Sequence, residues 1–409
     1  MRAILTVFGI LAVLLIAFAL SRHRRAINRR TIAVAFLLQA GLAAFIIAAP
    51  WGRSALASAV RSVQHVMNYA NDGIEFVFGS QVTPTLGFTI AFNVLPVIVF
   101  FAALMSALYY LGVMQAVVGV LGGALQKLLQ TTRAESVSAA SNIFVGHTDA
   151  PLVVRPYLAR MTQSELFAVM TGGCATIAGG VMMAYANMGV DLGYLLTASF
   201  MAAPGGLLIA KIMLPETETP APQAGEGAPV TEDRPANIFE AIGNGALTGM
   251  QIAFSVGAML IAFVAIIYLL NGLLGWAGGF VGLPDLSLQG ILGWLFAPVA
   301  YLLGVPWDEA MTAGSLIGQK LVLNEFYAYA AFMEVRGELS EYTQLVVTYA
   351  LCGFSNLGSI AILLGGLGAV IPERRHDIAR LGLRAVIGGT LVNLMNAGLA
   401  GLFFSLASL

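Results

Sequence analysis

A polar stretch within an otherwise apolar chain reads Ser141-Asn142-Ile143-Phe144-Val145-Gly146-His147-Thr148-Asp149-Ala150-Pro151. It places an amide, an imidazole, a hydroxyl and a carboxylate close together. Hydrophobic residues make up 58% of the 409 residues and charged residues only 10%, far below the roughly 25% charged residues of a soluble domain. We therefore expect an all-α polytopic membrane protein, in which polar side chains at membrane depth face a binding site or a pathway.

Composition excludes several classes of function. The net charge of −1 argues against nucleic-acid binding and against docking to an anionic surface. Cys174 and Cys352 are far apart in apolar segments and lack metal-ligand spacing, so we expect free thiols. No cofactor is expected beyond a coupling ion.

Apolar runs of about 20 residues, the length that crosses a bilayer, occur about eight times. They lie near residues 3–20, 32–49, 88–111, 166–188, 192–214, 248–270, 342–370 and 383–404. Only Arg2 precedes the first run, whereas five arginines follow it between residues 22 and 30, so we expect a span rather than a cleaved signal peptide. The positive-inside rule makes this arginine cluster cytoplasmic. The count then places both termini outside.

Two segments are too polar or too short to cross the bilayer. Residues 135–160 have an apolar first arm, the polar stretch and a second arm, and residues 307–336 repeat this plan around Leu323-Asn324-Glu325-Phe326. We interpret each as a re-entrant hairpin. A span rich in small and polar residues follows each hairpin, at 171–180 and 352–359. Because glycine weakens a helix by about 1 kcal/mol relative to alanine, we expect both spans to be broken.

A hairpin followed by a broken span thus occurs twice, entering first from the cytoplasm and then from outside. This pattern is typical of inverted repeats in secondary transporters, whose site lies where the four irregular segments meet. Near 114–129 and 238–247, the sequence predicts either interfacial helices or buried connectors. The chain divides into two N-terminal spans (1–50), a scaffold and an interfacial helix (51–133), a first transport half (134–214), a disordered cytoplasmic linker (215–236), an interfacial and a scaffold helix (237–306), and a second transport half with the last span (307–409).

Four segments resemble, in matching order, the signature segments of the concentrative nucleoside transporters. They read VGHTDAPL from Val145, ATIAG from Ala175, GQKLVLNEF from Gly318 and CGFSN from Cys352. The likeness runs from about residue 88 to the end of the chain, whereas the first two spans carry little signature.

The resemblance implies a homotrimer in which each protomer moves a transport domain past a scaffold, in an elevator-like symport of nucleoside and cation. It implies nucleobase contacts from Gly146, His147, Thr148, Asp149 and Val181. It implies ribose contacts from Glu325, Phe354, Asn356 and Ser359. It implies a sodium ion held by the side chains of Asn142 and Thr176 and the main-chain oxygens of Val145 and Ile177.

Two positions depart from the family pattern, which commonly has Gln at His147 and Glu at Asp149. Aspartate is one methylene shorter than glutamate, and an imidazole cannot reproduce the paired donor and acceptor of a primary amide. Base selectivity is therefore open, and an altered nucleoside-like substrate is an alternative.

Several of these side chains also have a structural interpretation. Glu325 could pair with Lys320, although a spacing of five residues does not place both on one helical face. Asp149 could cap a helix. His147 could be a buried histidine or a proton carrier, and Phe354 could be packing.

The favoured function is a sodium-coupled nucleoside symporter of the bacterial inner membrane. One alternative keeps the fold but is driven by protons that titrate His147 and Asp149. A passive channel would need a continuous polar stripe along several helices, whereas polarity here is confined to four short segments. An enzyme is not expected, because His147-Thr148-Asp149 is its only candidate set.

Overall fold

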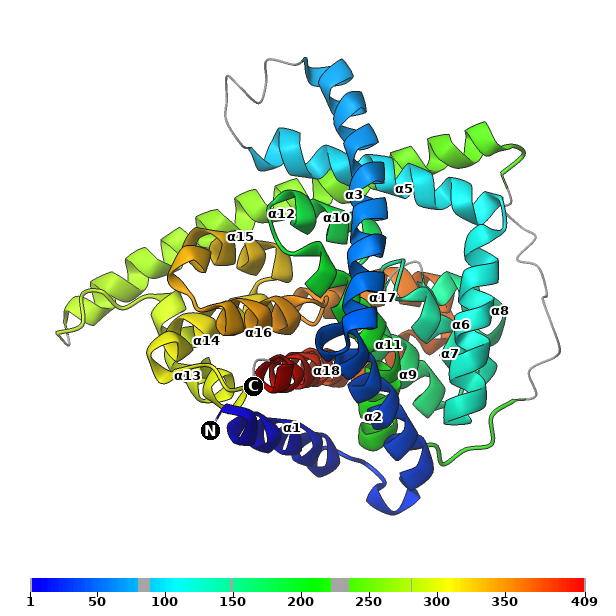
Figure 1. The fold of residues 1–409 in the computed structure, drawn as a ribbon, viewed down its shortest axis with the longest axis horizontal. Helices are drawn as coiled ribbons and strands as arrows, with labels where there is room; N and C mark the ends of the chain where they lie inside the picture. The colour runs from blue at the N-terminus through cyan, green and yellow to red at the C-terminus, as the bar shows by residue number, and fades with distance from the viewer. Residues whose placement is uncertain (1, 80–88, 148–149, 222–234, 281, 408–409) are drawn as a thin grey trace.

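The computed structural model describes residues 2–79, 89–147, 150–221, 235–280 and 282–407, and within these ranges it contains helices and turns but no strand (Figure 1). Seven helices are long and apolar enough to cross a membrane. They are α1 (Arg2–Ala19), α2 with the turn that extends it (Arg29–Ala48), α5 with the turn before it (Ile90–Tyr110), the pair α9 and α10 (Gln163–Asn187), α11 (Leu192–Met213), α12 (Ile238–Gly279) and α18 with the turn before it (Pro372–Ala407). The predicted all-α polytopic fold is confirmed.

Both predicted breaks are present. Helices α9 (Gln163–Ala175) and α10 (Gly179–Asn187) are separated by residues 176–178. The run expected at 342–370 consists of α16 (Glu341–Leu351) and α17 (Gly358–Val370), separated by residues 352–357. It is therefore not among the seven candidate spans. The possible eighth candidate is instead the pair α13 (Leu288–Leu302) and α14 (Trp307–Val322), which meet at 116°.

The two predicted hairpins differ in regularity. In the second, α14 is followed by the turn at 323–324 and by α15 (Glu325–Val335). In the first, α7 (Arg133–Ser141) is followed by a short 3-10 turn (Ala150–Val154) and the four-residue α8 (Arg155–Leu158). Pro151 and Pro156 explain the shorter arm, because each lacks the N–H that an α-helical ladder needs.

Helix α12 differs from the expectation of an interfacial helix followed by a separate span. It is one helix of 42 residues, about 63 Å long at 1.5 Å per residue. Its glycines serve packing rather than a break: a Cβ on Gly249 would lie 2.7 Å from Val99 Cα of α5 (Leu95–Tyr110), and one on Gly245 would lie 2.7 Å from Ala102 O. The glycines therefore allow close contact between α5 and α12.

Two helices were not predicted from the sequence: α13, and α3 (Pro50–Phe78), a helix of 29 residues. Helix α3 is amphipathic and carries Arg53 and Arg61, so its sequence does not look like an apolar span. The helix expected near 114–129 is present as α6 (Val113–Leu129). Residues 222–234 of the predicted linker lie outside the described residues, and 215–221 contain no helix.

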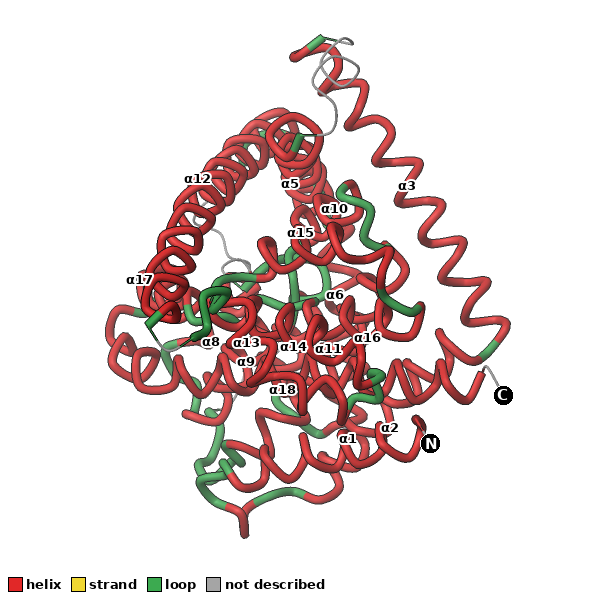
Figure 2. Tube along the Cα trace, turned by 90° about the vertical axis from the view of Figure 1, so that its left-hand side faces the viewer, coloured by secondary structure: helices red, strands yellow, loops and turns green. Residues whose placement is uncertain are grey.

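Four helices form the interior. Helices α9, α11, α16 and α18 (Arg375–Ala407) pack on one another and are mostly buried. Helices α5 and α12 pack together to one side of this bundle, and α3 runs along another edge (Figures 1 and 2). The predicted free thiols, Cys174 and Cys352, are buried and unpaired.

Candidate functional site

The four irregular segments meet, and backbone hydrogen bonds join them. The first hairpin is bonded to the α9–α10 break, this break to the α16–α17 break, and the latter to the second hairpin. The bonds run from Gly179 N to Phe144 O (2.9 Å), from Phe354 N to Thr176 O (3.1 Å) and from Leu357 N to Leu321 O (3.0 Å). The arrangement expected of an inverted repeat is thus present as a connected unit.

Asn393 of α18 is hydrogen-bonded to both breaks. Its Nδ2 donates to the carbonyl oxygens of Ala175 (2.8 Å) and Cys352 (2.7 Å), one at each break. Its Oδ1 accepts from Lys320 Nζ (2.7 Å) and Ser355 Oγ (2.8 Å). The backbone groups freed by the breaks therefore find partners within the protein, as membrane depth requires.

A cavity of about 550 Å³ lies where the four segments meet, within the size range of small-molecule sites. Seven residues predicted to contact substrate line it: Gly146, His147, Val181, Glu325, Phe354, Asn356 and Ser359. The other two, Thr148 and Asp149, lie outside the described residues. Every predicted substrate residue that the structure describes therefore faces one cavity.

Glu325 is a buried carboxylate at the first residue of α15, where the helix N-terminus favours negative charge. Its Oε1 accepts from Tyr185 OH (3.1 Å) and its Oε2 from Asn356 Nδ2 (3.0 Å). Asn356 is held in turn by Ser359 N, which donates to Asn356 Oδ1 (2.9 Å). In the described ranges Glu325 and Lys320 do not lie within ion-pair distance of each other, but their charges interact at longer range.

His147 and Phe354 form a pair of rings at the cavity, with centroids 4.7 Å apart in a T-shaped arrangement. His147 is buried, yet neither ring nitrogen has a hydrogen-bond partner among the described residues. A buried polar group without a partner is costly. The imidazole lines the cavity, beside Phe354. Gly173 permits this placement, because a Cβ there would lie 2.7 Å from His147 Cβ.

The residues expected to hold sodium lie together at the first hairpin and the α9–α10 break. Asn142 is 1% exposed, and neither Oδ1 nor Nδ2 has a partner within the part of the chain that the structure describes. A Cβ on Gly172 would lie 3.3 Å from Asn142 Nδ2, and Thr176 Oγ1 donates to Gly172 O (3.1 Å). Val145 and Ile177 supply non-helical backbone. Neutral oxygens of this kind fit a hard monovalent cation.

Two contributions to the site were not predicted from the sequence. Tyr185 gives no signal, because a tyrosine in an apolar run usually packs. Thr248, Gln251 and Ser255 of α12 line the same cavity. Their spacing of three and four residues places them on one helical face, and polar residues at this spacing within an apolar run were a readable signal.

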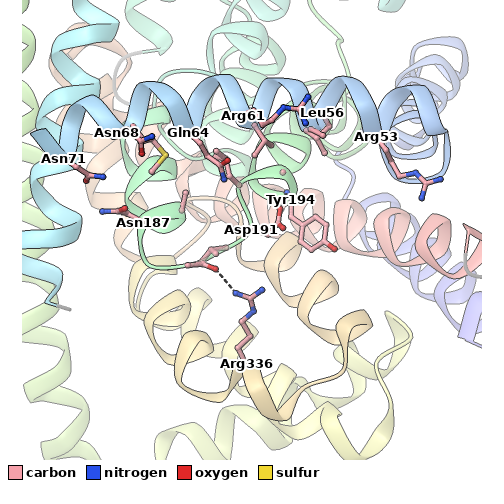
Figure 3. A pocket seen from close by; sticks show the side chains of 18 residues that line it. Arg53, Leu56, Arg61, Gln64, Asn68, Asn71, Asn187, Asp191, Tyr194 and Arg336 are labelled. Carbon is pink, nitrogen blue, oxygen red and sulfur yellow. Dashed lines mark hydrogen bonds between the residues drawn. The ribbon is translucent and has the colours of Figure 1, made fainter. Parts of the chain in front are cut away.

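A second cavity of about 910 Å³ lies between α3 and the loop that joins α10 to α11 (Figure 3). It is lined by Arg53, Arg61 and Gln64 of α3, by Asp191 and by Arg336, among others. Arg336 Nη1 donates to the carbonyl oxygen of Gly189 (2.7 Å). None of the predicted site residues that the structure describes lines this cavity, which is therefore distinct from the cavity at the four irregular segments.

Comparison with known proteins gives matches along nearly the whole chain. Residues 8–81 match the family described as "Na+ dependent nucleoside transporter N-terminus", 91–191 match "Nucleoside recognition", and 194–401 match "Na+ dependent nucleoside transporter C-terminus". An "Uncharacterized transporter" of Haemophilus influenzae is 53% identical over 418 residues, covering 100% of this chain and 99% of its own. The "Nucleoside permease NupC" of Helicobacter pylori is 49% identical over 415 residues, covering 99% and 98%.

Solved structures also match. The structure titled "CNTnw in an inward-facing substrate-bound state" is 52% identical, covers 99% of both chains and has a TM-score of 0.95. A variant of the same protein in an outward-facing state matches with a TM-score of 0.96, at 51% identity and 99% coverage of both chains.

Proposed function

Because the chain belongs to the Na+-dependent nucleoside transporter family, we propose that it is a symporter that imports nucleosides with sodium across a bacterial inner membrane. The family consists of transporters and not of enzymes, so His147 has no catalytic role. Relatives solved in inward-facing and outward-facing states support transport by alternating access.

The observation that carries the proposal is the cavity where all four irregular segments meet. On the ribose side, Glu325 accepts hydrogen bonds from sugar hydroxyls, and such charge-assisted bonds are stronger than neutral ones. Asn356 and Ser359 complete this side. On the base side lie Gly146, His147 and Val181, with Thr148 and Asp149 adjoining them in sequence, and Phe354 covers the ligand.

Sodium binds at Asn142 and Thr176, with main-chain oxygens of Val145 and Ile177. The unpartnered Asn142 amide supports this assignment. An ion there links the first hairpin to the α9–α10 break and so fixes Gly146 and His147 beside the base. Since the ion and the nucleoside favour the same arrangement, each raises the affinity for the other.

Transport proceeds by an elevator-like movement of the two transport halves past the scaffold helices α5 and α12. The 135–160 and 307–336 segments act as re-entrant hairpins, both termini lie outside, and the protomers form a homotrimer. The cavity beside α3 supports such a movement, because it leaves room between α3 and the α10–α11 loop (Figure 3).

The test is uptake of labelled uridine by the purified protein in liposomes, with sodium and proton gradients imposed separately. We expect accumulation with an inward sodium gradient and competition by nucleosides but not by free bases. Accumulation driven only by a proton gradient would contradict sodium coupling and support the alternative of a proton-coupled symporter. Equilibration without accumulation under either gradient would indicate a passive channel.

A further inference from the structure

Lys320 is a buried ammonium that the proposed cycle does not use. It lies in the last turn of α14 and is 1% exposed. Its Nζ donates to Asn393 Oδ1 (2.7 Å), to Ala350 O (3.5 Å) and to Ser355 Oγ. No carboxylate of the described residues lies within ion-pair distance of it, and only at longer range does its charge interact with that of Glu325. Burying a charge is costly, and an apolar side chain would pack there without that cost. Packing alone therefore does not explain why a lysine occupies this position.

Lys320 occupies the place in the second half that Asn142 occupies in the first. Asn142 directly follows α7, the first arm of its hairpin, and lies over Gly172 in the last turn of α9 before the break. Lys320 lies in the last turn of α14, the first arm of the other hairpin, and its Nζ donates to the carbonyl oxygen of Ala350 in the last turn of α16 before the break. In both halves, the end of a hairpin's first arm thus faces the last turn of a broken helix.

The ligands of the ammonium are also those that a sodium ion would take. Lys320 Nζ is surrounded by an amide oxygen (Asn393), a hydroxyl (Ser355) and a main-chain carbonyl (Ala350). The proposed sodium site of the first half offers the same three kinds of oxygen. Asn393 joins the two places, since its Nδ2 bonds the carbonyl oxygens of Ala175 and Cys352.

We propose that the Lys320 ammonium is the resident cation of the second half, in the place that corresponds to the sodium site of the first. This inference rests on the sodium site of the proposed function. An ammonium tethered to the chain cannot dissociate, so the α16–α17 break, with Asn356 and Glu325 beside it, is held in place throughout the cycle. Sodium in the first half then provides the only exchangeable cation that nucleoside binding requires.

The test compares Lys320→Gln with Lys320→Met by measuring uridine affinity of the purified proteins across sodium concentrations, with choline holding ionic strength constant. Gln and Met have similar length, but only Gln brings an oxygen that can ligate an ion. The logarithm of the uridine association constant is plotted against the logarithm of the sodium concentration. For the unmodified protein we expect a slope of about one. For Lys320→Gln we expect a slope of about two, because a second sodium ion must bind. Lys320→Met should bind uridine at least about 10-fold more weakly at every sodium concentration, with its slope unchanged.

Equal slopes and unmodified affinity in both variants would overturn the proposal. If Lys320→Gln is unfolded at low sodium, its thermal melting is measured in sodium and in choline. Recovery of folded protein in sodium but not in choline would support a second ion site. No recovery in sodium would contradict it. The sodium coupling is tested apart from this. Sodium-independent uridine binding by the unmodified protein would contradict the proposed coupling, whereas a sodium requirement newly acquired by Lys320→Gln would still support the resident cation.

Discussion

At the scale of single residues, the proposed role of Glu325 can be tested by substitution. Replacing it with Gln keeps the shape but removes the charge, which in the proposed site strengthens the hydrogen bonds to ribose hydroxyls. We expect Glu325→Gln to weaken uridine binding by about 10- to 100-fold, measured by equilibrium binding to the purified protein. Tyr185→Phe is the matched control, because it removes only the hydroxyl that donates to Glu325, and it should cost about 10-fold or less. Equal, small effects of both changes would argue against ribose binding at Glu325.

His147 makes a prediction about selectivity. Its ring nitrogens have no partner among the side chains and backbone that the structure describes, and an imidazole presents donors and acceptors differently from a primary amide. His147→Gln should therefore change the order in which purine and pyrimidine nucleosides compete with labelled uridine. Phe354 lies against the same ring, and Phe354→Leu should weaken all nucleosides without reordering them. An unchanged competition order in His147→Gln would place the imidazole outside the base contact.

At the scale of elements, stability should depend on the tie between the two broken helices. Asn393→Ala removes the partners of the carbonyl oxygens at both breaks and one acceptor of Lys320. Because these groups are buried, we expect a loss of about 3 kcal/mol in unfolding free energy and a lower melting temperature. Thr390→Ala on the same helix removes only a bond to Val386 O within that helix (2.9 Å) and should change stability by less than about 0.5 kcal/mol. Similar melting temperatures for both variants would contradict the structural role of Asn393.

Helix α12 supplies a second prediction at this scale. Gln251 lies on the face of α12 that lines the cavity, whereas Phe254 does not line it and is 72% exposed. Gln251→Leu should lower kcat/KM for uridine uptake by about 3- to 10-fold through a lost polar contact, without altering sodium dependence. Phe254→Leu should leave uptake unchanged. If both variants behave alike, α12 forms a passive wall of the cavity.

Among the elements, the breaks and hairpins could be predicted because they depart locally from the pattern of an apolar span. The polar run at 141–151 and the small residues at 171–180 and 352–359 are visible without tertiary information. The length of α12 could not be predicted, because Gly245 and Gly249 resemble helix breakers until α5 is seen to pack against them. Helix α3 could not be predicted as a span, because its polar face interrupts the apolar run that marks one.

At the scale of the whole molecule, sequence positions alone do not tell which residues share one cavity. The seven described residues that were predicted to contact substrate came from a family resemblance, and the fold places all of them around one cavity. Tyr185 and Gln251 join them only through tertiary packing, Tyr185 by its bond to Glu325 and Gln251 by the position of α12 beside the bundle. The residues within the sequence motifs could therefore be predicted, whereas the residues that tertiary packing brings beside them could not.

The central claim is that the four irregular segments form one nucleoside site. It is tested most directly by an experimental structure of the protein in lipid nanodiscs with uridine and sodium. We predict uridine in the cavity lined by Glu325 and His147, with ribose hydroxyls hydrogen-bonded to Glu325 and Asn356 and the base beside Val181. Uridine bound instead in the cavity beside α3 (Figure 3), with the first cavity holding no nucleoside, would contradict the account.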